Sequence, residues 1–197
     1  MNQERIRVVI ADDEPITRMD IKEILISEGY DVIGEAADGF DAVELCKNRR
    51  PDLVLMDVKM PLLDGLSAAR IIHEEQLVDT VMLVTAYSER EFVDGAKTAG
   101  VGGYLVKPID EKSLIPSIEL AVTRGREMKK LRKDMEKVSE RLVNRTIIEK
   151  AKGLVMDSNR MNEQEAYDYI RKLSLSKKLS MRRVAEIILL CGGRQTI

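Results

Sequence analysis

The sequence predicts an α/β protein with a five-stranded, parallel, doubly wound sheet, followed by a coiled-coil helix and a small three-helix all-α domain. Five short apolar runs alternate with amphipathic helical stretches over the first 115 or so residues. Continuous apolar strands of this kind indicate a parallel sheet that is covered on both faces. From Met128 the apolar residues recur every 3.5 positions, and beyond Leu142 they form a wider apolar stripe. Short, right-handed connections favour the strand order 2-1-3-4-5.

The elements of the front domain follow from this alternation. The five apolar runs predict strands at Arg7–Ala11, Asp31–Ala36, Asp52–Met56, Thr80–Thr85 and Gly102–Val106. Amphipathic stretches predict helices at Ile16–Ser27, Phe40–Asn48, Leu66–Glu75, Glu91–Ala99 and Glu111–Thr123. Pro116 is awkward in the last of these helices. It would be tolerated in a first turn if that helix effectively begins near Ser113.

A coiled-coil seam is predicted next. Its apolar residues repeat every 3.5 positions between charged flanks and are the candidate dimerisation residues: Met128, Leu131, Met135, Val138 and Leu142. Two heptads alone would pair weakly, and a single solvated connecting helix is the alternative. The expected domains are residues 1–123, the linker 124–142, and a tail at 143–197.

Three short helices are predicted in the tail, the first of them continuous with the coiled coil. A wider apolar stripe ending near Asn159 marks the first helix. Asn162 with Glu165 resembles a capping box for the second, and Ser180 can cap the third. Tyr167 and Tyr169 point to different faces, so one of them is expected in the core.

Composition bounds the class of protein. Hydrophobic residues make up 44% of 197 residues, and no apolar stretch approaches the roughly 20 residues of a membrane span. We therefore expect a soluble, cytoplasmic protein without a membrane partner. Cys46 and Cys191 are interpreted as reduced structural thiols, and His73 as a helix-surface residue. Through Pro116 there are 23 acidic and 13 basic residues, against 11 and 19 beyond it. The basic rear favours a polyanionic partner.

Charged and polar residues lie at the ends of the apolar runs. Asp12, Asp13 and Asp57 supply carboxylates, Thr85 a hydroxyl and Lys107 an ammonium. The carboxyl ends of parallel strands meet at one sheet edge, where open α/β sheets place their chemistry. Crowded carboxylates repel one another unless a cation joins them. A carboxylate with Mg²⁺ and a nearby lysine can accept a phosphoryl group.

These residues, with Met60-Pro61, Asp64-Gly65, Ala86, Tyr104 and Pro108, make about Ile6 to Thr123 resemble the receiver domain of two-component response regulators. The resemblance implies a flavodoxin-like fold and phosphorylation of Asp57 by a cognate sensor histidine kinase. It implies Mg²⁺ held by Asp13, Asp57 and the backbone carbonyl of Lys59, with Asp12 assisting through water. Lys107 would pair with one phosphoryl oxygen and Thr85 would move to another. Tyr104 would then rotate inward, unless it is a plain surface aromatic.

An enzyme is the rival interpretation of this front domain. Phosphatases with an aspartyl nucleophile resemble it but use Asp-x-Asp, in which the second aspartate serves as acid and base. The sequence here is Asp57-Val58-Lys59, which lacks the second aspartate. We therefore expect a protein that is not an enzyme.

The tail resembles the ANTAR domain, an RNA-binding module of transcription antiterminators, over about Leu142 to Leu190. The string Ala151-Lys152-Gly153-Leu154 with Met156 carries most of this likeness. It implies binding to stem-loops in nascent leader RNA, which prevents a terminator hairpin from forming. The candidate RNA-binding residues are Arg145, Lys150, Lys152, Gly153, Arg171, Lys172, Lys177, Lys178, Arg182 and Arg183.

Several alternatives stay open for the tail. A helix-turn-helix that binds DNA is one, and a protein-interaction output is another. Gly153 would be explained by a close helix crossing or by close approach of RNA, since glycine costs roughly 1 kcal/mol in a helix interior. Within the family, the string from Ala11 to Asp20 looks most like regulators of ethanolamine utilisation in Gram-positive bacteria.

Together these features predict a switch. Phosphorylation of Asp57 would make the face of the fourth helix, fifth strand and fifth helix pair with another copy. The seam would then form a coiled coil between two copies, and the homodimer would hold two basic tails at a fixed separation. Two linked tails would bind a two-site RNA more tightly than one, because the second contact becomes intramolecular.

Overall fold

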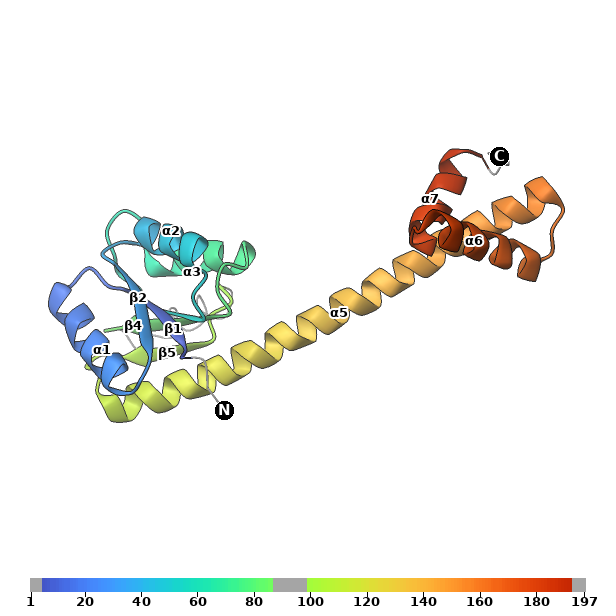
Figure 1. The fold of residues 1–197 in the computed structure, drawn as a ribbon. Coiled ribbons are helices and arrows are strands. Elements are labelled where there is room, and N and C mark those ends of the chain that lie inside the picture. The colour runs from blue at the N-terminus through green and yellow to red at the C-terminus, as the bar shows by residue number, and fades with distance from the viewer. Residues whose placement is uncertain (1–4, 87–98, 193–197) are drawn as a thin grey trace. The chain divides into compact units, whose positions relative to one another are not determined.

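The front of the chain is a five-stranded parallel sheet. The computed structural model of the protein describes residues 5–86 and 99–192. Its strands are β1 (Arg7–Ala11), β2 (Asp31–Ala36), β3 (Leu53–Asp57), β4 (Thr80–Thr85) and β5 (Gly103–Val106). They pair in the order β2-β1-β3-β4-β5, all parallel (Figure 1). The predicted fold class and strand order are confirmed.

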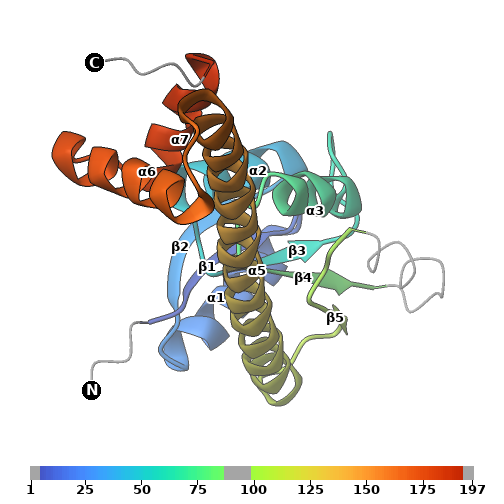
Figure 2. The ribbon, with the colours of Figure 1, turned by 90° about the vertical axis from the view of Figure 1, so that its right-hand side faces the viewer.

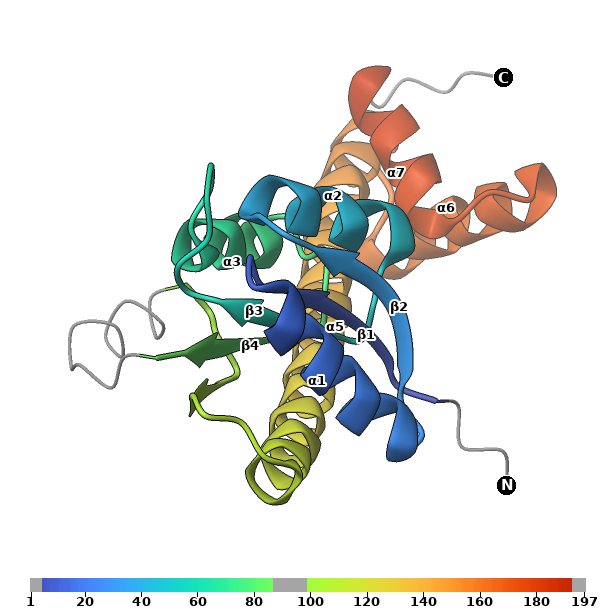
Figure 3. The same ribbon diagram turned by 90° about the vertical axis from the view of Figure 1, so that its left-hand side faces the viewer.

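Helices cover both faces of this sheet. Helices α2 (Gly39–Arg49) and α3 (Gly65–Glu74) pack on one face, with Ala42, Cys46 and Ile72 fully buried. Helix α1 (Pro15–Ser27) and the first turns of α5 (Glu111–Asn159) pack on the other, as Figure 3 shows for α1. The helix expected over Glu91–Ala99 lies, apart from Ala99, outside the described residues.

Helix α5 begins at Glu111, as predicted, and not near Ser113 as the position of Pro116 suggested. The Asp110 carboxylate accepts the Ser113 amide at 2.8 Å, and the helix begins at Glu111. Pro116 is therefore its sixth residue and not part of the first turn. Proline cannot donate to the carbonyl four residues before it, but Pro116 is exposed, so water can satisfy that carbonyl.

Helix α5 is one 49-residue element that continues through the predicted linker into the tail. The only weak helix former between Thr123 and Met128 is Gly125, and no proline interrupts the helix there. Each seam residue from Met128 to Leu142 is more than half exposed, from 54% at Val138 to 74% at Met135. The single chain therefore carries an uncovered apolar stripe on α5.

The tail is a small helical bundle. Helices α6 (Glu163–Lys177) and α7 (Met181–Leu190) pack around the last turns of α5 (Figure 2). Its core contains Ala151, Ile170, Val184 and Ala185. The predicted capping box of Asn162 and Glu165 is present, and the predicted cap Ser180 accepts the Arg183 amide.

The chain divides into two compact units, one ending at Lys130 and one beginning at Leu131. Among the described residues, no helix combines the length and apolarity that a bilayer span requires.

Candidate functional site

Three carboxylates meet at the carboxyl edge of the sheet. Asp57 is the last residue of β3, and Asp12 directly follows β1. The two strands are neighbours, with Ala11 opposite Met56, so Asp12 and Asp57 lie side by side. One oxygen each of Asp12, Asp13 and Asp57 lies within 4.8 Å of the others. The topology thus forces like charges together, as predicted.

Lys107 reaches into this cluster. It follows β5, and its amide donates to the Thr85 carbonyl at 2.8 Å. Its ammonium Nζ donates to Asp12 Oδ2 at 2.8 Å and to Asp57 Oδ2 at 2.9 Å. Burial acts to lower the pKa of Lys107, but these two carboxylates raise it above its ordinary value. Lys107 is therefore charged and offsets part of the repulsion between the carboxylates.

Asp12 is the most buried member, with 1% of its surface exposed. Its Oδ1 accepts the Glu14 amide at 2.9 Å, and its Oδ2 accepts from Lys107. Burial nevertheless raises the pKa of Asp12, because the hydrogen bonds do not replace the hydration that the charge has lost. A hard divalent cation suits such a set of oxygen atoms, since it prefers carboxylates and retains waters.

The loop after β3 folds back over Asp57. The Gly65 amide donates to the Val58 carbonyl at 2.9 Å, and Asp64 caps α3 through Ser67. A Cβ atom at Gly65 would lie 1.9 Å from the Asp57 carbonyl oxygen, so a side chain there would displace this loop. The Lys59 amide lies 3.4 Å from Asp57 Oδ1, at the outer limit of a hydrogen bond.

The predicted switch residues lie on the two strands beside the cluster. Thr85 ends β4 and is 3% exposed. Tyr104 lies on β5 opposite Leu83 and is 49% exposed. The structure therefore brings Thr85 to the same edge as Asp57 and directs Tyr104 outward.

Two residues of this site were not singled out from the sequence, Arg18 on α1 and Glu35 on β2. The Arg18 guanidinium donates to the Asp12 backbone carbonyl, and its Nε lies 3.8 Å from Glu35 Oε2. In the sequence Arg18 is one more charged residue of an amphipathic helix, and nothing in the spacing marks it.

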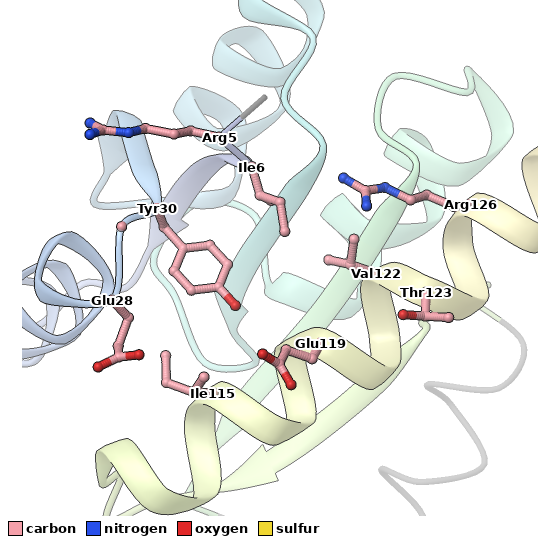
Figure 4. Close-up of a pocket in the computed structure, with 10 residues that line it drawn as sticks. Arg5, Ile6, Glu28, Tyr30, Ile115, Glu119, Val122, Thr123 and Arg126 are labelled. Atoms are coloured by element: carbon pink, nitrogen blue, oxygen red, sulfur yellow. The ribbon is translucent and has the colours of Figure 1, made fainter. Parts of the chain in front are cut away.

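A separate depression of about 630 Å³ lies at the opposite edge of the sheet. It is lined by Ile6, Tyr30, Glu119, Val122 and Arg126, among others (Figure 4). Ile6 and Tyr30 stand just before β1 and β2, at the amino ends of those strands. Burial, together with Glu119 and Glu28, raises the pKa of the Tyr30 phenol, which therefore stays neutral. None of the clustered carboxylates takes part in it.

The candidate RNA-binding residues of the tail fall into two groups. Seven of them are exposed, namely Arg145, Lys150, Arg171, Lys172, Lys177, Lys178 and Arg183. Lys152 is instead 8% exposed, and its Nζ lies 2.6 Å from Glu149 and 2.7 Å from Glu163. These two carboxylates raise the pKa of Lys152.

Arg182 and Arg183 are also paired. Both contact Glu186, at 2.9 and 3.1 Å, and Arg182 donates to the Asn144 side chain at 3.1 Å. Their hydrogen bonds lower the pKa of Glu186. Part of the positive charge that the sequence assigns to the tail is thus neutralised within the bundle.

Gly153 and the tyrosines test two further interpretations. A Cβ atom at Gly153 would meet nothing within 4 Å, so among the described residues no helix crosses closely there, and that explanation was wrong. Close approach by a ligand is the explanation that stays open. Tyr169 packs against the bundle core and Tyr167 is 39% exposed, which confirms that one of the two is core.

The fold and the carboxylate cluster together define a receiver domain, the input module of a signalling protein. The sequence profile of the response regulator receiver domain matches residues 8–119, and that of the ANTAR domain matches residues 136–189. The chain therefore belongs to the response regulators that carry a C-terminal ANTAR domain. This is a family of regulators, which confirms the prediction that the protein is not an enzyme.

Several known proteins are similar to this chain. The transcriptional regulatory protein PdtaR of Mycobacterium tuberculosis is 46% identical over 93% of this chain and 89% of its own length. The chemotaxis protein CheY of Bacillus subtilis is 36% identical over 57% of this chain and 93% of its own length. The narrower likeness to ethanolamine-utilisation regulators stays a prediction.

Solved structures agree on the fold of the front domain. The signal receiver domain of NarL from M. tuberculosis aligns with a TM-score of 0.59 and 32% identity, over 61% of this chain and 98% of that one. A CheX–CheY–BeF₃–Mg²⁺ complex from Borrelia burgdorferi aligns with a TM-score of 0.55 and 29% identity, over 57% of this chain and 86% of that one.

Neutralising Asp12 should stabilise the fold. Because the folded-state pKa of Asp12 is raised, the folded protein binds this proton more tightly than the unfolded chain, and the cost of its ionised form appears as pH rises through the folded pKa. Asp12→Asn should therefore raise the urea midpoint at pH 7. Relative to the variant, the wild type should lose stability as pH rises from acid toward neutral.

Urea unfolding between pH 3 and pH 8 checks this. Asp64→Asn is the opposite control, because the Ser67 hydrogen bonds outweigh partial burial and lower the pKa of Asp64. Removal of that charge should destabilise the protein at neutral pH. A urea midpoint of Asp12→Asn at or below that of the wild type at pH 7 would contradict the conclusion that the charge on Asp12 destabilises the fold.

Proposed function

We propose that this protein is a phosphorylation-activated regulator whose tail binds hairpins in nascent leader RNA and prevents transcription termination. The observation that carries the first half is the cluster of Asp12, Asp13 and Asp57 with Lys107 between two of them. The ANTAR match and the relative PdtaR support the second half.

Asp57 is the proposed phosphoryl acceptor. Lys107 holds its Oδ2, and Oδ1 accepts the Lys59 amide at the long distance of 3.4 Å. In the transfer a carboxylate oxygen of Asp57 bonds to phosphorus, and the bond from phosphorus to the kinase histidine breaks. Asp13, Asp57 and the Lys59 carbonyl, with Asp12 behind them, are the groups that would hold Mg²⁺. When bound, that ion offsets the repulsion between the anionic acceptor and the anionic donor.

Lys107 and Thr85 are the groups placed to respond. After transfer the Lys107 ammonium exchanges its contact with Asp57 for one with a phosphoryl oxygen, and Thr85 turns toward another. Tyr104, now exposed, rotates inward. Val106 on β5 and Leu120 on α5 are also exposed apolar residues, and we propose that they belong to the face that pairs with a second copy.

The seam supports a homodimer as the active form. Five apolar residues at coiled-coil spacing are uncovered in the single chain, and two heptads give a pair weak enough to be switched. A change of a few kcal/mol at the receiver is then sufficient to move the equilibrium from mostly single chains to mostly pairs.

RNA is the proposed ligand of the tail. The seven exposed cations, of which Arg183 also contacts Glu186, suit a phosphate backbone, and Tyr167 offers one aromatic ring for stacking. Gly153 has open space around it on a helix where glycine is unfavourable, which fits close approach by a nucleic-acid backbone.

Removal of the acceptor should uncouple input from output. Asp57→Ala should abolish the dimerisation that beryllofluoride with Mg²⁺ induces in the wild type, and leave basal hairpin binding within about twofold. Analytical ultracentrifugation with and without beryllofluoride measures the first effect. A wild type that is a tight dimer in both states would contradict the switch, and so would an Asp57→Ala variant that still responds.

A charge placed in the seam should prevent pairing. Leu131→Glu buries a carboxylate against its own copy in the dimer, so the activated dimer should weaken at least about tenfold, since an unpaired buried charge is costly. Lys133→Glu, two residues along and off the seam, is the matched control and should pair like the wild type. Equal effects of the two changes in sedimentation would contradict the seam.

Gly153→Ala should separate stability from binding. The tail should become more stable by about 1 kcal/mol, because alanine is the better helix former. If RNA approaches the helix there, its affinity should fall at least about tenfold. Ser139→Ala, an exposed change in the linker part of α5, is the control for helix propensity alone.

A competition assay decides the ligand class. A fluorescent hairpin RNA is challenged with unlabelled hairpin or with a duplex DNA of the same sequence. Displacement by RNA at concentrations where DNA fails supports the proposal. Preference for duplex DNA, or no binding to either, would favour the alternative outputs.

A further inference from the structure

Arg18 lies behind the acidic cluster, not inside it. It is the fourth residue of α1, and its side chain is 18% exposed. Its Nη1 donates to the backbone carbonyl of Asp12, and its buried Nε lies 3.8 Å from Glu35 Oε2. Lys22 Nζ binds the other Glu35 oxygen at 2.6 Å. Arg18 is thus held between the start of the Asp12-Asp13 turn and β2.

These contacts close a ring around Asp12. Glu35 precedes Ala36 on β2, and the Ala36 carbonyl accepts the Asp12 amide at 3.1 Å. Arg18 in turn links the Glu35 carboxylate to the backbone carbonyl of Asp12. With Lys107 and the Glu14 amide on its carboxylate, every polar group of Asp12 has a partner.

The ring also constrains Asp13. The Asp12 carbonyl and the Asp13 amide belong to one planar peptide unit, so the direction of one fixes the direction of the other. Asp13 itself is exposed. Without Arg18 the peptide plane could rotate, and the Asp13 carboxylate would turn away from Asp12 and Asp57. Mg²⁺ tolerates little departure from octahedral geometry, so such a rotation weakens its binding.

We propose that Arg18 is a positioning residue for divalent-cation capture at the phosphoryl-accepting site. It acts through the peptide between Asp12 and Asp13, and its guanidinium lies against Glu35, which Lys22 holds through its other oxygen. The inference rests on the proposed function, because it assumes that the carboxylate cluster binds the cation. A purely structural Arg18 would contribute to folding stability and leave cation affinity unchanged.

The test is cation affinity, measured on the full chain with Mn²⁺, which accepts the same oxygen ligands and whose free form is counted by EPR. Arg18→Ala should raise the Mn²⁺ dissociation constant roughly tenfold to a hundredfold, as loss of an outer-shell partner does at metal sites. With acetyl phosphate as donor, the Mg²⁺ concentration for half-maximal phosphorylation should rise likewise. The rate at saturating Mg²⁺ should change less than about threefold.

Arg49 provides a matched control. It lies on α2, and like Arg18 it donates from Nη1 to a backbone carbonyl. The acceptor is Ile33 on β2, away from the cluster. Arg49→Ala should therefore change thermal stability about as much as Arg18→Ala but leave Mn²⁺ binding unchanged. Should Arg18→Ala fail to fold, Glu35→Gln loosens the same guanidinium and should weaken Mn²⁺ binding by roughly threefold or more.

The outcomes are distinguishable. Equal Mn²⁺ affinity in wild type and Arg18→Ala (or Glu35→Gln, where that variant is used) overturns the positioning role, and so does an equal loss in Arg18→Ala and Arg49→Ala. A wild type that binds no Mn²⁺ and accepts no phosphoryl group overturns the proposed function itself, and the role of Arg18 falls with it.

Discussion

Repulsion between carboxylates at one sheet edge is the constraint on which the site depends. Parallel strands have a direction, so residues at their carboxyl ends meet, and β1 and β3 are neighbours. Asp12 and Asp57 consequently share Lys107, and Asp13 adds a third charge beside them. One ammonium cannot neutralise three carboxylates, and burial makes the charge on Asp12 costly. Added positive charge at the site therefore lowers this repulsion, which is the property a cation-dependent phosphoryl acceptor requires.

The sequence was sufficient for the fold and for the groups at the edge. Apolar runs that end in Asp, Thr or Lys locate those side chains, because strand direction alone determines which edge they reach. The contacts of Arg18 and Glu35 could not be obtained this way. They depend on how α1 is rotated over β2, and a charged residue on a helix is indistinguishable in the sequence from a solvated one. The place of Pro116 in α5 was misjudged for a related reason, since the Asp110 cap starts the helix at Glu111 and leaves this proline beyond the first turn.

The tail shows how far charge counting can mislead. Its basic composition indicates a polyanion partner, yet Lys152, Arg182 and Arg183 are already paired with glutamates. These pairs join α5 to α6 and brace α7, so the same cations organise the bundle. A ligand that recruited them would have to exchange an existing contact. The exposed cations and the open face around Gly153 are therefore where contact with RNA costs the bundle least.

The two units share one feature, which is apolar surface that a single chain leaves uncovered. In the receiver it includes Tyr104, Val106 and Leu120, and in α5 it is the seam from Met128 to Leu142. The seam by itself holds two chains together only weakly, because a two-heptad coil gains little over the entropy lost on association. In the proposed dimer both surfaces are covered in one event, so their contributions add while that entropy is lost once. A phosphoryl group that reorders only the receiver face can then determine whether the seam pairs.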